Sequence, residues 1–208
     1  MNGTEFIAKI LKAEGIDSVT CFPSNPLIEA VAKEGIRPIS FRNERGAVMA
    51  ADGFSRISQR KKFGVAIVQS QAGAENAMGG IAQAYADNIP ILLMPGGISL
   101  SQLGVKPNFS VLQNYQGWVK QVETVLSPNE VGNVMRRSFN ALRNGPPGPV
   151  VVEMTSDVCS LEIPKDSENY CSPRSAKVIP SQNDIRDAVK YLMKAKKPLI
   201  WAGGGVLM

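Results

Sequence analysis

The chain has 208 residues, of which 44% are hydrophobic and 20% are charged, so it can bury a core and is not a disordered segment. Its net charge of +5 comes from 23 basic and 18 acidic residues spread along the sequence, which excludes a concentrated nucleic-acid-binding patch and leaves a mild preference for anionic ligands. The three cysteines, Cys21, Cys159 and Cys171, lack the spacing of a zinc site or of a disulfide framework, so we expect reduced thiols and no metal site in this chain.

The N-terminal segment TEFIAKILKAEG is an amphipathic helix with internal charges rather than a signal peptide. No apolar run in the sequence reaches the length needed to span a bilayer. We therefore expect a soluble, cytoplasmic protein that binds neither a membrane nor nucleic acid.

The first half of the chain alternates short apolar runs with helical patterns. Strands that alternate with helices predict a parallel sheet with right-handed crossovers. The expected elements, in chain order, are a helix over residues 4–14, a strand over 17–22, a helix over 26–33, a strand over 37–41, a helix that begins near 44, a strand over 65–69, a helix over 72–87 and a strand over 91–94.

The second half resumes this pattern after residues 98–116, which have no periodicity and gather Gly, Ser, Asn and Pro. We expect these residues to form a surface loop, and loops of this length are often functional. A strand over 118–125, a helix over 128–143 that starts at Ser127 and Pro128, and a strand over 150–154 follow. The expected fold class is α/β, a three-layer α/β/α arrangement around a central parallel sheet of about six strands.

The composition changes after residue 163. Residues 164–180 are polar and rich in proline, as in a linker, and residues 182–195 form an amphipathic helix. The final PLIWAGGGVLM begins a strand and a glycine turn, and a domain does not end inside its first βα turn. We therefore expect a first domain over 1–163, a linker over 164–180 and the truncated beginning of a second α/β domain over 181–208, so that the chain is the front of a longer protein.

One acidic residue stands where a ligand can meet it. Glu44 follows the short apolar run RPISF and opens an Ala-rich helix in the segment RNERGAVMAADGFSR, residues 42–56. In a parallel α/β sheet, ligands bind in the loops at the carboxyl ends of the strands. The alternative is a first-turn acid that only complements the helix dipole behind Asn43 as N-cap.

Three segments in this order carry a family resemblance: Glu44 with Gly46, Ala47 and residues 51–54, then FGVAIVQSQAGAENAMGGIAQAYADNIPILLMPGG at 63–97, and NGPPGPVVVEMTSDV at 144–158. Together they resemble the pyrimidine-binding (PYR) domain of thiamine-diphosphate enzymes, of the kind found in acetolactate synthase and benzoylformate decarboxylase. Three matches in the family's order are far more specific than any one of them.

The resemblance implies that Glu44 is the catalytic residue. In the family, a carboxylate hydrogen-bonds N1′ of the cofactor's aminopyrimidine and favours the imino tautomer, whose 4′-nitrogen removes the C2 proton. An amide could bind the ring but could not exchange this proton. The residues expected at the pyrimidine end of thiamine diphosphate are Pro23, Ser24, Glu44, Gln69, Ser70, Gly73 and Asn76.

The resemblance also suggests contacts to the substrate. Gln116 and Lys120 stand where synthase-like members have a Gln and a Lys entering a strand, but a solvent-facing pair at a strand edge fits the sequence equally well. The candidate substrate residues are Asn25, Gln71, Gln116 and Lys120.

The other half of the cofactor site is missing from the sequence. In the family the diphosphate and Mg²⁺ require a Gly-Asp-Gly turn followed by a later Asn, and no Gly-Asp-Gly occurs here, since the Asp52-Gly53 pair belongs to the Glu44 helix. The resemblance implies that a diphosphate-binding (PP) domain outside this chain holds Mg²⁺, that the active site forms between subunits of a homodimer or tetramer, and that FAD is a further cofactor open to the full-length protein. The chain alone is expected to catalyse nothing.

Departures from the family bear on the substrate. Gln69 replaces the active-site His of benzoylformate decarboxylase, and residues 71–73 replace the Gly-Pro-Gly turn of acetolactate synthases. Asn43 and Arg45 flank Glu44 where synthases often show His and Gln, and the early Pro-Gly loop becomes residues 23–25. Because the chain contains no His, this domain offers no imidazole for proton relay, which disfavours simple decarboxylation of pyruvate or benzoylformate.

The expected helix over 72–87 carries many small residues, mostly Ala and Gly. Gly79 and Gly80 each cost roughly 1 kcal/mol relative to Ala inside a helix, so close approach by another backbone is expected to compensate. The sequence leaves open whether this is packing on the helix's own sheet or a contact between subunits.

The expected function is therefore that of the N-terminal domain of an acetolactate synthase-like transferase or lyase, which decarboxylates a 2-oxo acid and then ligates or protonates the product. One alternative is a non-catalytic α/β binding or assembly module with the same fold. A nucleotide-binding oxidoreductase domain is a third hypothesis, which rests on fold analogy and on the terminal AGGGV.

Overall fold

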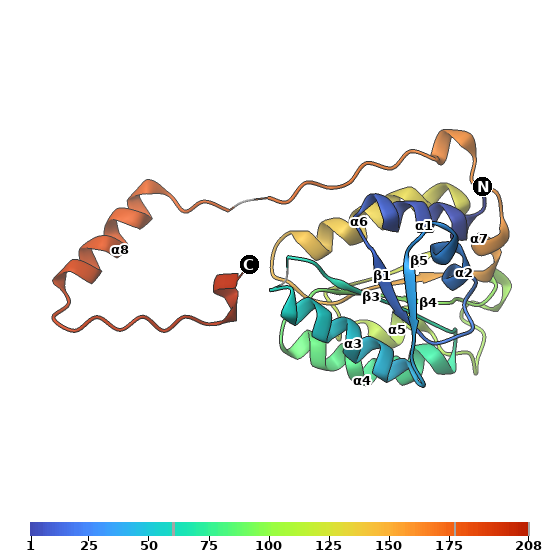
Figure 1. The fold of residues 1–208 in the computed structure, drawn as a ribbon, viewed down its shortest axis with the longest axis horizontal. Helices are drawn as coiled ribbons and strands as arrows, with labels where there is room; N and C mark the ends of the chain where they lie inside the picture. Colours follow the sequence, from blue (N-terminus) through green and yellow to red (C-terminus); the bar gives the residue numbers. More distant parts are fainter. Residues whose placement is uncertain (60, 177, 208) are drawn as a thin grey trace.

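The computed structural model describes residues 1–59, 61–176 and 178–207, and these residues form a three-layer α/β/α domain with a C-terminal extension (Figure 1). The central sheet has six strands in the order β2-β1-β3-β4-β6-β5, and every pairing is parallel. The expected fold class is confirmed. The strands are β1 (Ser18–Cys21), β2 (Arg37–Ser40), β3 (Gly64–Val68), β4 (Ile91–Pro95), β5 (Gln121–Val125) and β6 (Val150–Met154).

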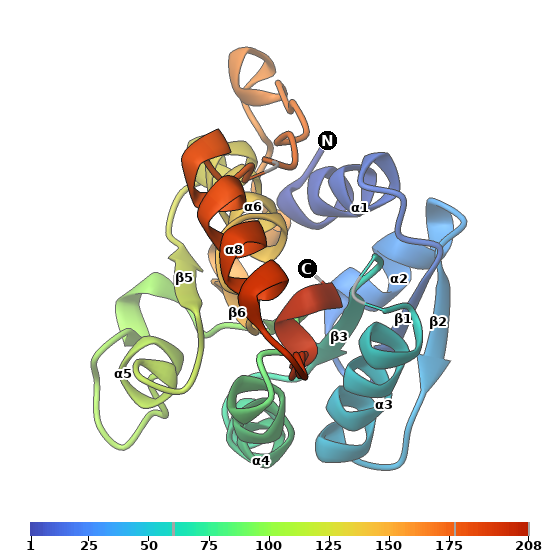
Figure 2. The same ribbon diagram turned by 90° about the vertical axis from the view of Figure 1, so that its left-hand side faces the viewer.

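Helices cover both faces of the sheet (Figure 2). One face carries α1 (Gly3–Ala13), α2 (Pro26–Lys33), α6 (Val131–Arg143) and the short α7 (Ser156–Ser160). The opposite face carries α3 (Glu44–Ile57), α4 (Ala72–Ala86) and α5 (Val111–Tyr115).

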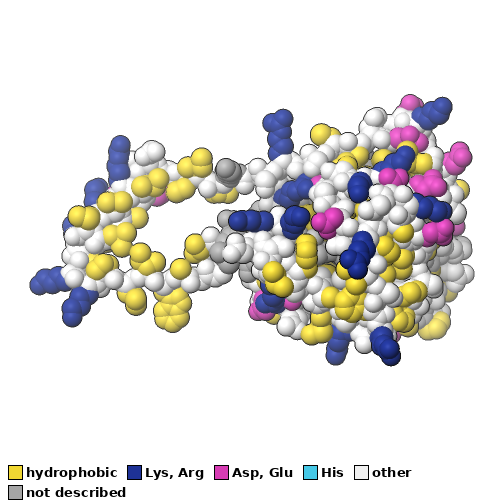
Figure 3. All heavy atoms as spheres, in the orientation of Figure 1, with side chains coloured by type: hydrophobic (Ala, Val, Ile, Leu, Met, Phe, Trp, Pro, Cys, Tyr) yellow, Lys and Arg dark blue, Asp and Glu magenta, His cyan; other side chains and the backbone are white. Residues whose placement is uncertain are grey.

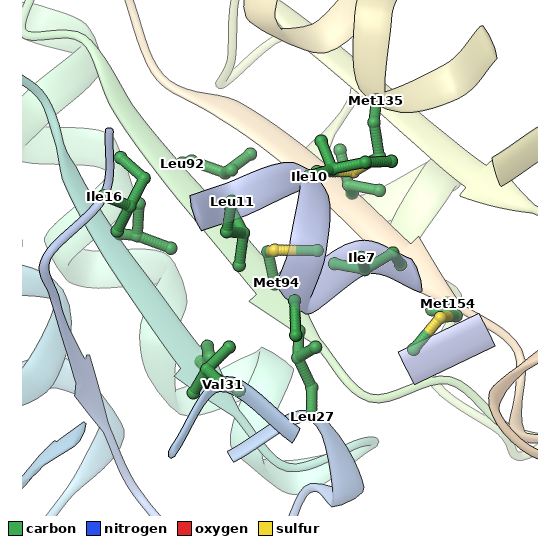
Figure 4. Packing of buried hydrophobic residues seen from close by; sticks show 14 of the residues in the cluster. Ile7, Ile10, Leu11, Ile16, Leu27, Val31, Leu92, Met94, Met135 and Met154 are labelled. Atoms are coloured by element: carbon green, nitrogen blue, oxygen red, sulfur yellow. The ribbon is translucent and has the colours of Figure 1, made fainter. Parts of the chain in front are cut away.

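The sheet separates two hydrophobic clusters. Along β4, Leu92 and Met94 face α1 and α2, whereas Ile91 and Leu93 face α3 and α4, because successive side chains of a strand point to opposite faces. Figure 4 shows Leu92 and Met94 beside Leu11 of α1. The central strands are buried on both faces, which explains why they read as continuous apolar runs in the sequence.

Three expected elements differ in detail. Strand β5 begins at Gln121 rather than at 118, because residues 118–120 form a bend before the strand pairs with β6. The expected loop over 98–116 contains a 3₁₀ turn, Leu100–Gln102, as well as α5. The helix expected from 128 begins with a separate 3₁₀ turn, Pro128–Glu130, before α6.

Gly79 and Gly80 of α4 lie against side chains of helix α3 of the same chain. A Cβ at Gly79 would lie 2.3 Å from Nη2 of Arg45, and a Cβ at Gly80 would lie 2.7 Å from Cγ1 of Val48. The small side chains of α4 therefore let α3 pack closely against it, and the close neighbours are side chains of α3.

The C-terminal extension lies apart from the domain (Figures 1 and 3). Its helix, α8 (Gln182–Lys194), is exposed along its whole length, and Figure 3 shows hydrophobic side chains along it. The expected strand in residues 198–203 is wrong for the described part of the chain, since a strand needs a partner and these residues have no regular structure before a 3₁₀ turn at Gly204–Leu207. Met208 lies outside the described residues, and the division into domains stays a prediction.

The first part of the expected linker packs on the domain. We call residues 164–176 the strap. The carboxylate of Glu14 is fully buried and forms an ion pair with Arg143 at the end of α6. It also accepts hydrogen bonds from the hydroxyls of Tyr170 and Ser172 in the strap. One buried charge thus joins the end of α1, the end of α6 and the strap.

Within the described residues, each helix is too short or too polar to cross a lipid bilayer.

The variant Arg143→Met tests the attachment of the strap. It leaves the buried carboxylate of Glu14 without its cation, and we expect the free energy of unfolding to fall by about 3 kcal/mol. Limited proteolysis should then cut residues 164–176 faster. The matched control is Arg137→Met on the same helix, which removes a half-exposed ion pair with Glu123 and should cost less than about 1 kcal/mol. Equal losses in urea unfolding would show that the strap is not held in this way.

Candidate cofactor site

The strand order creates a crevice between β1 and β3. The chain leaves β1 for α2 on one face of the sheet and leaves β3 for α4 on the other face. In open α/β sheets, ligands bind outside the carboxyl ends of the strands where neighbouring connections diverge. The loop after β1 carries Pro23, Ser24 and Asn25, and the loop after β3 carries Gln69 and Ser70.

Glu44 is the first residue of α3 and lies at this same edge. Its N-cap, Asn43, accepts a hydrogen bond from the backbone N–H of Gly46 at 2.6 Å, so the expected helix start is confirmed. The side chain that caps α3 is therefore that of Asn43, not that of Glu44. The Glu44 side chain is only 5% exposed, which is unusual for an acid in a first helical turn.

The Glu44 carboxylate has one anchored oxygen. Nδ2 of Asn76, on α4, donates a hydrogen bond to Oε2 of Glu44 at 2.6 Å. The other oxygen, Oε1, lies beside Gly73, where an added Cβ would be 3.2 Å away. The same Cβ would lie 2.2 Å from Cγ of Gln69. The absence of a side chain at position 73 thus gives room to both the carboxylate and Gln69, and these four residues form one cluster.

Ser24 and Ser70 lie together on a neighbouring part of the edge. Both line a pocket of about 360 Å³ that also touches Gly96 and the start of α7. Pro23 and Ser24 line an adjoining groove of about 520 Å³ along α2. The predicted cofactor residues are therefore divided between the Glu44 cluster, this hydroxyl-lined pocket and the adjoining groove.

Asn25, predicted to contact the substrate, is occupied by the protein itself. Its Oδ1 accepts from the backbone N–H of Leu27 at 3.0 Å and caps α2. Its Nδ2 donates to the carbonyl oxygens of Val68 at 2.8 Å and of Met94 at 3.4 Å. Asn25 ties the ends of β3 and β4 to α2, so its polar atoms hold the crevice in shape.

Lys120 lies at the opposite edge of the sheet. It directly precedes β5, and its Nζ donates to the carbonyl oxygens of Ala141 and Asn144 at the end of α6, each at 2.5 Å. Burial lowers the pKa of the Lys120 ammonium. Gln116 is exposed at the end of α5. The structure therefore does not bring Lys120 to the Glu44 cluster of this chain, because residues before a parallel strand and after one lie at opposite edges.

A second pocket of about 360 Å³ also opens at that opposite edge, between Lys61, Phe63 and Arg143. None of the predicted site residues lines it.

Two features of the crevice were not identified from the sequence. Gly96, after β4, lets the backbone pass close to the loop that follows β3. A Cβ at position 96 would lie 3.3 Å from the backbone nitrogen of Ser70. Asp157, after β6, accepts from the backbone N–H of Leu100 at 2.6 Å and fixes the loop that follows β4. In the sequence, both residues closely follow an apolar run, and this position could have identified them.

Glu153 is another buried acid, and it was not among the predicted site residues. Its side chain is 5% exposed, and burial raises the pKa of its carboxyl group, while a hydrogen bond from Thr124 Oγ1 at 3.0 Å opposes this rise. Val151 faces α3 and α4, so the alternation along β6 puts Glu153 on that side too. The acid inside the apolar run VVVEM, residues 150–154, could have identified Glu153 from the sequence.

Comparison with known proteins agrees with this geometry. Residues 1–124 match the family model of the thiamine pyrophosphate enzyme, N-terminal TPP binding domain. The chain is 31% identical over 213 residues to the acetolactate synthase isozyme 2 large subunit of Escherichia coli K12, with 100% of this chain and 38% of that protein covered. It is also 31% identical over 220 residues to the probable acetolactate synthase large subunit of Methanocaldococcus jannaschii, with 100% and 36% covered.

The chain thus spans little more than a third of the length of the curated relatives it matches. The family match covers more than half of the chain and includes Glu44, Gln69, Gly73 and Asn76. On these grounds, the chain belongs to the thiamine pyrophosphate enzyme family and carries its N-terminal cofactor-binding domain.

Proposed function

We propose that this chain is the pyrimidine-binding domain of a thiamine-diphosphate-dependent enzyme that acts on a 2-oxo acid, by decarboxylation, carboligation or both. The observation that carries the proposal is the buried carboxylate of Glu44 at the crevice, with one oxygen anchored by Asn76. The relatives named acetolactate synthase support a reaction of that kind.

The residues present suit the pyrimidine end of the cofactor. A buried acid can share a proton with a ring nitrogen, and the missing side chain at Gly73 gives room to Oε1 of that acid and to the side chain of Gln69. The amide of Gln69, in the same cluster, can donate to or accept from an aminopyrimidine. When bound, thiamine diphosphate supplies an acidic carbon that adds to the 2-oxo group and takes up the electrons released by decarboxylation.

The chain's own residues then have distinct tasks. Glu44 holds or transfers a proton at N1′ of the aminopyrimidine. Asn76 orients the Glu44 carboxylate by its 2.6 Å hydrogen bond, so the acid does not have to be ordered when the cofactor binds. Burial of Glu44 excludes water from this proton exchange. Ser24 and Ser70 provide hydroxyls farther along the edge.

The diphosphate end needs partners beyond these residues. We propose that a further domain binds the diphosphate through Mg²⁺, that the complete site forms in a homodimer or tetramer, and that this 208-residue chain alone turns over no substrate. FAD is a further cofactor to test in the full-length protein. We also propose a cytoplasmic location, which the free thiols of Cys21, Cys159 and Cys171 support.

The test of the proposed function is Glu44→Gln in the full-length protein. We expect the exchange of the cofactor C2 proton for deuterium, followed by NMR, and turnover of 2-oxo acids to fall by at least about 100-fold, because an amide cannot exchange the proton. Circular dichroism should show an unchanged fold. The matched control is Glu75→Gln, the same change at an exposed first-turn acid of α4, which should leave both rates unchanged.

Turnover that survives Glu44→Gln would contradict the proposal. If the wild-type full-length protein binds the cofactor without any turnover across a panel of 2-oxo acids, the chain is a non-catalytic module with the same fold.

A second variant, Asn76→Asp, tests the hydrogen bond that anchors Glu44. It replaces the donating amide, now 2.6 Å from Oε2 of Glu44, with a second carboxyl group. Repulsion between the two carboxylates should destabilise the folded state at pH 7 by about 2 kcal/mol. The penalty should shrink as the pH falls towards 4, because protonation of either group removes the repulsion. Thermal unfolding across this pH range measures the effect.

The control is Asn76→Ala, which removes the anchor without adding charge, so its stability loss should depend much less on pH. A pH-independent loss in Asn76→Asp would show that Asn76 and Glu44 are not in contact.

A further inference from the structure

Gln71 has a backbone conformation that side chains rarely adopt. It precedes α4 with φ of 56° and ψ of −112°, a region that glycine occupies freely and other residues enter only with strain. Its side chain does not cap α4. A residue kept in this conformation at the rim of a functional site calls for a reason other than the backbone turn itself.

The side chain of Gln71 supplies such a reason. Its Oε1 accepts a hydrogen bond from the backbone N–H of Phe109 at 2.9 Å. Phe109 belongs to the loop over residues 98–110, which connects β4 to α5, and its side chain packs against the cluster beneath α4. Gln71 therefore joins this loop to the turn that carries Gly73.

Two further hydrogen bonds attach the segment that contains this loop. The backbone N–H of Leu100 donates to Asp157 after β6 at 2.6 Å. Beyond the loop, the hydroxyl of Tyr115 on α5 donates to the carbonyl oxygen of Ala74 on α4 at 2.6 Å. The bond from Gln71 lies between these two attachments, next to the first turn of α4. It thus fastens the C-terminal end of the loop beside the first turn of α4, which carries Gly73 of the Glu44 cluster.

We propose that Gln71 is a positioning residue that fastens the 98–110 loop to the rim of the cofactor site and so determines how the substrate side of that site is closed. The inference rests on the proposed function for the identity of the site. Glycine at this position would relieve the backbone but would lack the acceptor oxygen. The backbone strain at Gln71 thus accompanies a side chain that makes the hydrogen bond to Phe109.

The first test compares Gln71→Met with Gln71→Glu. Both keep the side-chain length and the strained β-carbon, but only Glu keeps an oxygen that can accept from Phe109. Hydrogen exchange of the Phe109 amide, followed by NMR, should accelerate by about three- to tenfold in Gln71→Met and stay close to wild type in Gln71→Glu. Equal exchange in all three proteins would overturn the proposal.

The second test separates the hydrogen bond from the strain. Gln71→Ala and Gln71→Gly both remove the acceptor, and only glycine relieves the backbone. We expect both to lose protection at Phe109 to the same extent, while Gln71→Gly melts about 2–4 °C above Gln71→Ala. Because the two variants differ in melting temperature, an equal loss of protection at Phe109 in both cannot come from general destabilisation. A glycine variant that keeps the Phe109 protection would contradict the proposal.

The third test uses the full-length enzyme. Loosening the loop should raise KM for the 2-oxo acid by at least about threefold in Gln71→Met with kcat within about twofold, and Gln71→Glu should restore KM. An unchanged KM beside a lost Phe109 protection would overturn the role in substrate closure. This outcome differs from failure of the proposed function, in which the wild type itself turns over no 2-oxo acid while the exchange results stand.

Discussion

The rest of the site depends on the burial of one carboxylate. Burying a polar carboxyl group without partners is costly, so the structure must satisfy the buried side chain of Glu44. Asn76 donates to one oxygen, and the missing side chain at Gly73 gives room to the other oxygen and to Gln69. The N-cap bond of Asn43 satisfies the helix start separately, which frees Glu44 from that task. The hydrogen bond from Asn76 thereby orders the Glu44 carboxylate within the protein itself.

The fold delivers this arrangement through the order of its strands. Because α2 and α4 leave the sheet on opposite faces, the loops after β1 and β3 diverge and open a crevice above the edge. Asn25 bridges the ends of β3 and β4 and keeps the crevice in shape. The close packing of α3 on α4, which Gly80 permits, brings Glu44 and Asn76 within hydrogen-bonding distance although they are 32 residues apart in the chain.

Much of the fold could be predicted from the sequence. The buried strands appear as apolar runs, and the helices have periodic faces, so element type and order followed directly from local patterns. Elements that depend on a partner were predicted less well. Strand β5 starts three residues later than expected, and residues 198–203 form no strand, because pairing decides where a strand exists. The composition of residues 164–180 predicts a linker, but nothing local marks Glu14 as the buried attachment of the strap.

The sequence by itself determined the family and predicted Glu44 as the acid of the site, because the segment around Glu44 and the two later motifs keep a fixed order along the chain. Only the tertiary structure decided which other residues stand near that acid. It brought Asn76, Gly73 and Gln69 to Glu44, used the polar atoms of Asn25 inside the protein, and put Lys120 at the far edge. The physical reason is that periodicity reports which face a residue takes within its own element, while hydrogen-bond partners depend on how separate elements pack.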